Sequence, residues 1–309
     1  MRKLYWSIFV SLVMFSCTNQ TETTDTTENS DSTTTVEENQ NGNQDEGEPK
    51  VQLNEDVINN IIQSIPSPLE TTVLIKEVGS DYLRKDLSNP NNVDNYTTSY
   101  TQALNLGVYS MNLGYANIYG KNQDILKYLN SIKKLADQLN IGQFFDYNTL
   151  KKLTSSSENL DSLLQLSTSN FEKINYHLRQ QKREYLSILI LTGGWLEATN
   201  VTSLIYKESG NKVLKERLGE QKIVLERILL VLEIYKTKPK FSELIADLKE
   251  LKRAYDSVEI IIERSDPIMK VEGDQIIIES QDKMVINITD EEIDTIINLL
   301  SSIRGKIVN

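Results

Sequence analysis

The most apolar stretch of the chain outside its first residues is EYLSILILTGGWLEATNVTSLIYK (184–207), which has helical length but carries two adjacent glycines, Gly193 and Gly194. A glycine inside a helix costs about 1 kcal/mol relative to alanine, so a pair needs a structural reason. Helix axes lie about 8–10 Å apart, and small residues allow approach at the close end of that range. We therefore expect a core helix that crosses a second helix closely at its glycines.

An earlier segment has a matching stripe of small residues at spacings of four, three and four. Its members are Ala103, Gly107, Ser110 and Gly114. The segments GVYSMNLGYANIYGKN (107–122) and GWLEATNVTSLIYKES (194–209) also share a glycine, an Ile-Tyr pair and a following turn at a constant offset of 87. Two related helical hairpins around a pseudo-symmetric four-helix centre would explain this internal similarity.

Close packing explains these small residues, and Trp195, without a ligand, so we prefer it to a binding site in this region. The region comprises Gly107, Gly114, Gly193, Gly194, Trp195 and Glu197. We expect Trp195 to fill the groove beside the crossing. Glu197 is harder to place, because an unpaired buried carboxylate is costly, and we expect it to make a structural hydrogen bond or ion pair. The expected partners lie on the next helix: Lys215, Arg217, Lys222 and Arg227.

Helical periodicity dominates residues 51–309, and glycine and proline are scarce. We expect a helix at 54–65 and a second one that ends at about 78. After a loop at 88–95, we expect a long helix that ends at 119 and another at about 122–139. Further helices are expected from 169 to 207, with a break near 181, and at 211–235 and 240–263. Ser169 with Glu172 has capping-box spacing for the start of one of them. The expected fold is an all-α bundle of antiparallel helical hairpins, and its main domain spans residues 51–265.

The last part of the chain changes character. DQIIIES (274–280) and KMVINIT (283–289) are β-branched runs joined by a short polar turn, which predicts a small β-hairpin. Thr289 with Glu292 forms a second capping-box pattern, and an apolar face from Ile293 to Ile303 predicts a closing helix. We expect residues 266–309 to form this hairpin with its helix packed on it.

The first residues predict export. Two basic residues precede a short apolar run, so residues 1–16 are expected to be a lipoprotein signal peptide. VMFSC (13–17) resembles a bacterial lipobox, which makes Cys17, the only cysteine, the expected site of lipidation. The rest of 17–50 has nine acidic residues, one lysine and a single valine, and predicts a disordered tether with a reach of roughly 30 Å.

Several kinds of chemistry lack their usual residues. His177 is the only histidine, so we expect no metal site of the zinc, copper or haem type. No Ser/His/Asp or Cys/His set and no glycine-rich phosphate loop can be assembled, so we expect no cofactor and no enzyme. A net charge of −11 argues against a nucleic-acid partner.

The blocks IPSPLETTVLIKEVG, ALNLGVYSMNLGYANIYG, QFFDY, TSNFEKIN and LTGGWLEA together resemble a family of uncharacterised Bacteroidota outer-membrane lipoproteins, over roughly residues 60–265. The resemblance implies a helical envelope protein and no activity. We expect a lipid-anchored, non-catalytic binding or scaffold module with a protein partner in the envelope, on the periplasmic side rather than the cell surface. The alternatives are a small-molecule or lipid-binding domain, and an enzyme dependent on Glu197.

Overall fold

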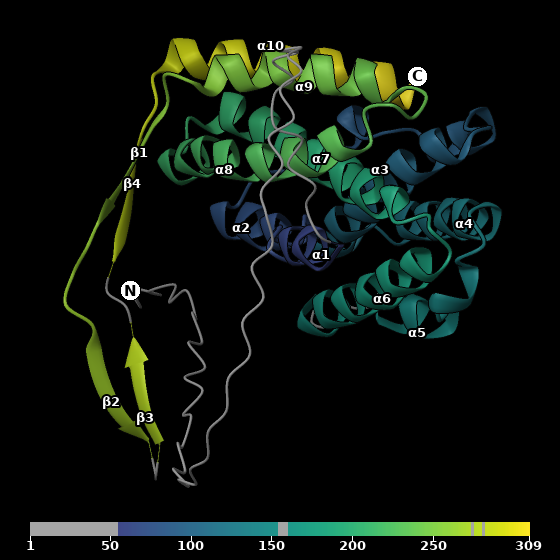
Figure 1. The fold of residues 1–309 in the computed structure, drawn as a ribbon, viewed down its shortest axis with the longest axis horizontal. Helices are drawn as coiled ribbons and strands as arrows, with labels where there is room; N and C mark the ends of the chain where they lie inside the picture. The colour runs from purple at the N-terminus through teal and green to yellow at the C-terminus, as the bar shows by residue number, and fades with distance from the viewer. Residues whose placement is uncertain (1–54, 154–159, 273–274, 280–281) are drawn as a thin grey trace, which may run out of the picture. The chain divides into compact units, whose positions relative to one another are not determined.

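The computed structural model describes residues 55–153, 160–272, 275–279 and 282–309, and the predicted signal peptide (1–16) and tether (17–50) lie outside these ranges (Figure 1). The described chain is mainly helical with short strands near its C-terminus, which confirms the expected all-α bundle. The helices are α1 (Glu55–Gln63), α2 (Glu70–Val78), α3 (Ser99–Ile118), α4 (Asn122–Gln138), α5 (Tyr147–Leu153), α6 (Leu160–Gln180), α7 (Tyr185–Ser209), α8 (Lys212–Ile234), α9 (Phe241–Tyr255) and α10 (Asp290–Val308), with 3-10 turns η1 (Arg84–Asp86), η2 (Pro90–Asn95) and η3 (Gly142–Phe144). The strands are β1 (Glu259–Glu263), β2 (Ile268–Glu272), β3 (Gln275–Glu279) and β4 (Lys283–Asn287).

Two compact units divide the chain. One comprises residues 54–263 and 284–309, and it contains all the helices named above. In the described ranges the other comprises residues 264–283, which include the antiparallel pair of β2 and β3, with Ile268 opposite Glu279. The closing helix α10 therefore groups with the helical unit and not with residues 266–283.

The centre of the helical unit is the pair α3 and α7. Their glycines meet near the middle of each helix, where a Cβ on Gly107 would lie 2.6 Å from the Gly194 backbone nitrogen. The C-terminal halves of both helices enter one hydrophobic cluster, so α3 and α7 run in the same direction. The members from these halves are Met111, Tyr115, Ile118, Ala198, Val201 and Ile205. The sequence offset of 87 thus relates two glycines in contact.

Helix α7 is a core helix. By length and composition it is apolar enough to cross a membrane, the one such helix among the described residues, but 89% of its most apolar 18-residue window is buried inside the protein. It begins after a break in which Lys182 has a φ of 56°, close to the expected break at Gln181. At its end Gly210 adopts a φ of 60°, a conformation that favours glycine, and the Asn211 side chain caps α8.

Two helix boundaries differ from the sequence prediction. Ser169 and Glu172 do not begin a helix, because α6 already starts at Leu160 and runs through them. Helix α9 ends at Tyr255, whereas the apolar spacing predicted a helix to Glu263. Residues 259–263 instead form β1, in line with the strand preference of three consecutive isoleucines, and Ile262 is 59% exposed.

The predicted strand segments exist, but their pairing was wrong. The run at 275–279 pairs with β2 and not with β4, while β4 pairs with β1. In the register of β2 and β3, Glu272 lies opposite Gln275, so only Gly-Asp separates the strands. A two-residue glycine-containing connection is a strong hairpin signal, and it outweighs the polar residues that follow β3.

Helices α9 and α10 lie side by side along one edge of the helical unit (Figure 1). The Thr289 side chain accepts a hydrogen bond from the Glu292 backbone and the Glu292 side chain accepts one from Thr289, which confirms the capping box. The apolar face of α10 is buried as predicted, and it packs against α9 and α7. Its buried members include Ile293, Ile296, Ile297, Leu300 and Ile303.

Candidate functional site

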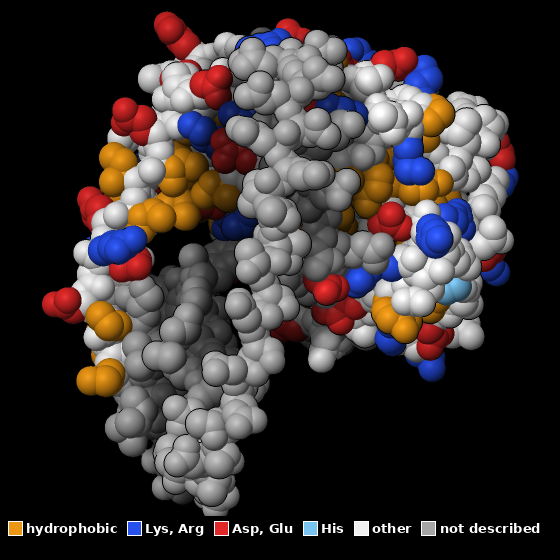
Figure 2. Space-filling model, viewed as in Figure 1, with side chains coloured by type: hydrophobic (Ala, Val, Ile, Leu, Met, Phe, Trp, Pro, Cys, Tyr) orange, Lys and Arg blue, Asp and Glu red, His pale blue; other side chains and the backbone are white. Residues whose placement is uncertain are grey.

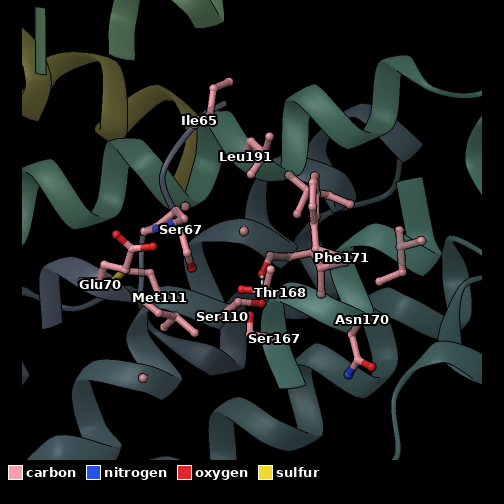
Figure 3. A pocket seen from close by; sticks show the side chains of 18 of the residues that line it. Ile65, Ser67, Glu70, Ser110, Met111, Ser167, Thr168, Asn170, Phe171 and Leu191 are labelled. Atoms are coloured by element: carbon pink, nitrogen blue, oxygen red, sulfur yellow. Dashed lines mark hydrogen bonds between the residues drawn. The ribbon is translucent and has the colours of Figure 1, made fainter. Parts of the chain in front are cut away.

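A cavity of about 520 Å³ lies beside the crossing of α3 and α7 (Figure 3). Its walls come from the loop between α1 and α2, the middle of α3, α6 and the first half of α7, all within the helical unit. Ligand pockets in proteins commonly measure about 300–1,000 Å³ and are mostly apolar with a few polar groups. This cavity has that size and composition.

Apolar side chains form most of the cavity lining. Leu106 and Met111 come from α3, Leu191 from α7, and Phe171 from α6. Phe171 and Ile190 are only half-buried, so part of this apolar surface meets solvent. An apolar molecule in the cavity would remove that surface from water, which is favourable by about 25 cal/mol per Å².

Hydroxyl and amide groups occupy another part of the lining. In the close-up, Ser110 of α3 and Ser167 and Thr168 of α6 lie in one region, and Ile65 and Leu191 lie in another (Figure 3). The Ser110 hydroxyl donates to the Leu106 carbonyl oxygen at 2.7 Å and keeps acceptor capacity. Ser167 and Thr168 are therefore polar lining residues in the interior of α6, next to Ser169, where the sequence predicted a helix start.

The glycines have three different roles. A Cβ on Gly193 would overlap the Leu104 backbone, and one on Gly107 would overlap the Ile190 carbonyl, so both permit the close crossing. A Cβ on Gly194 would meet the Pro68 ring at 3.0 Å, in the loop that covers the cavity. Gly114 gives room to Leu69 at the start of α2 and not to α7.

Trp195 lies outside the cavity lining. It is 3% exposed, and its Nε1 donates to the Gln221 Oε1 of α8 at 2.9 Å. It therefore packs at the interface of α7 with α8 and does not fill the groove beside the glycines.

Glu197 makes a buried ion pair, but its partner is Arg304 of the closing helix and none of the four basic residues expected on α8. Arg304 Nη2 lies 2.9 Å from Glu197 Oε1, and Nε contacts Oε2. The same Nη2 donates to the Ser88 hydroxyl and the Asp86 carbonyl, each at 3.0 Å. Burial alone would lower the pKa of Arg304, but the hydrogen bonds and charge of Glu197 raise it. These contacts tie α7, α10 and the loop before α3 together.

Buried tyrosines extend this network. The hydroxyls of Tyr109 and Tyr128 donate to the carbonyls of Asn89 and Ser88, at 2.9 and 2.8 Å. Tyr96 donates to the carbonyl of Val308 at the end of α10. Burial raises the pKa of all three hydroxyls. Each of these side chains thus satisfies a backbone acceptor, which is the structural use expected of buried tyrosine.

Glu197 contacts Arg304 and the Ser88 hydroxyl, and it does not line the cavity. Within the described ranges, no group of three or more His, Cys, Asp and Glu side chains is placed to hold a metal ion. The His177 ring packs against the Phe144 ring in a tilted arrangement, with ring centroids 4.9 Å apart.

Comparisons of the chain with protein-family models, with curated proteins and with solved structures found no match. The cavity and the ion pair are therefore interpreted from their own chemistry.

Proposed function

We propose that this protein is a lipid-anchored envelope protein that binds a small apolar molecule, such as a lipid, in the cavity beside the α3 and α7 crossing. The cavity carries the proposal, because its size and its apolar lining with grouped hydroxyls are those of a ligand site. Lipidation at Cys17 and the acidic tether would hold this domain near the outer membrane, on the periplasmic side. The protein is non-catalytic in this proposal.

Binding is tested with Nile red, a neutral apolar dye, and the chain from Thr18 to Asn309, which keeps every described residue. Thr168→Phe places a ring in the cavity from an exposed position on α6 and is expected to weaken dye binding at least tenfold. Thr295→Phe is the matched control, since Thr295 is an exposed threonine on α10 away from the cavity. Absence of saturable binding, or equal loss in both variants, would contradict the proposal.

A second candidate is a surface for a protein partner in the envelope. Figure 2 shows apolar side chains gathered over β1 and β4. Ile261, Ile262 and Met284 are 47%, 59% and 41% exposed there. A two-stranded ribbon also leaves strand edges free to pair with another chain.

This candidate is tested by crosslinking in cells of the source organism. A partner recovered with the native chain and lost with Ile262→Glu would support it. Recovery of the bait alone, or of the same proteins with both chains, would count against it.

A further inference from the structure

The charged residues that line the cavity are all acidic among the described residues. From this we infer that the ligand is a single-chain amphiphile with an uncharged, hydroxyl-bearing head group. Such a ligand is of the monoacylglycerol type and is not a free fatty acid. The inference rests on the proposed binding function. It specifies the chemistry of the ligand at the same cavity.

Acidic residues alone carry charge in the described lining. Glu70 of α2 and Glu172 of α6 line the cavity, and no lysine, arginine or histidine is among the described lining residues. A bound carboxylate would lose hydration without gaining a cationic partner, and it would lie in the field of two like charges. An uncharged head group avoids both costs.

One basic residue contacts the lining from outside the cavity. Arg227 of α8 donates from Nη1 to the carbonyl oxygen of Ser64 at 2.6 Å, and Ser64 lies at the cavity while Arg227 does not line it. Lys173 follows Glu172 on α6 but is exposed and is not part of the lining. Neither group supplies a built anion site.

The polar groups that do line the cavity match a hydroxylated head. Ser167 and Thr168 offer hydroxyls that both donate and accept, and the Ser110 hydroxyl, which donates to the Leu106 carbonyl, can accept a further hydrogen bond. Glycerol hydroxyls can pair with such groups without a net charge. The acyl chain would then extend along the apolar lining from Leu106 toward Leu191.

The test compares 1-monodecanoylglycerol with decanoate, which have the same acyl chain and different head groups. Each displaces Nile red from the Thr18–Asn309 chain at pH 8, at concentrations below micelle formation. The neutral ligand is expected to bind at least tenfold more tightly. In a Glu70→Gln/Glu172→Gln variant decanoate is expected to gain about two- to fivefold, a modest effect because both carboxylates are exposed.

Equal or tighter binding of decanoate would overturn the inference, and loss of that binding in Arg227→Gln would identify the anion site responsible. Unchanged decanoate affinity in the double glutamine variant would show that the lining charge does not select the ligand. Failure of the proposed function is distinguishable, because Nile red itself would then show no saturable binding.

Discussion

Replacing Arg304 with methionine should be among the most damaging single changes to this fold. The substitution keeps an apolar stem but leaves the Glu197 carboxylate, which is 0% exposed, without its cationic partner. The Ser88 hydroxyl, 3.4 Å from Oε1, is too distant to replace it. Removing one partner of a buried ion pair costs about 3–5 kcal/mol. We expect Arg304→Met to lower the free energy of unfolding by that amount.

Two variants separate this cost from other effects of changing α10. Glu197→Leu/Arg304→Met removes both charges and should recover most of the loss, since apolar replacement of a buried pair is often neutral. Lys306→Met removes an exposed ion pair with Asp247 from the same helix, and should cost less than about 1 kcal/mol.

The assay is urea unfolding followed by circular dichroism at pH 8. A deficit below about 1 kcal/mol, or a double variant no more stable than Arg304→Met, would refute the reasoning.

Two further predictions concern packing and alkaline stability. Gly107→Ala should destabilise the fold by about 1–3 kcal/mol in urea unfolding, because its Cβ would meet the α7 backbone; Gly305→Ala, with only Asn309 Nδ2 at 3.8 Å, should stabilise it by about 0.5–1 kcal/mol. Burial raises the pKa of Tyr128 above its usual value of 10.0, so its stabilising contribution is present below pH 10 and is lost as pH rises further. Unfolding between pH 9 and 11 should therefore show falling stability, and Tyr128→Phe should reduce the fall between pH 10 and pH 11 by about 1 kcal/mol. Equal tolerance of alanine at both glycines, or an unchanged alkaline slope, would contradict these interpretations.

Local sequence patterns predicted those parts of the fold that local physics decides. The capping box at Thr289 and the glycine contact between α3 and α7 follow from short-range hydrogen bonding and from residue size. The end of α9 was missed because Val258 and Ile262 continue a helical spacing, although the intervening isoleucines favour a strand. The spacing of apolar residues takes no account of the strand propensity of isoleucine.

The site is built from contacts between residues that are far apart in the sequence, and spacing along the chain does not predict such contacts. Arg304 lies 107 residues from Glu197, so its role could be found only by placing α10 against α7. The cavity was equally hidden, because Ser167 and Thr168 line a cavity only once α6 lies beside α3, and their spacing in the sequence does not predict that packing. The glycines signalled a close crossing, and the sequence held no comparable sign of the space beside it.

The most direct test of the binding proposal is a crystal structure of the Thr18–Asn309 chain grown with 1-monodecanoylglycerol. The account predicts one ligand in the cavity, its chain against Leu106 and Leu191 and its head group at Ser110 and Thr168. A cavity closed by its own side chains, or ligand bound only elsewhere on the protein, would contradict it.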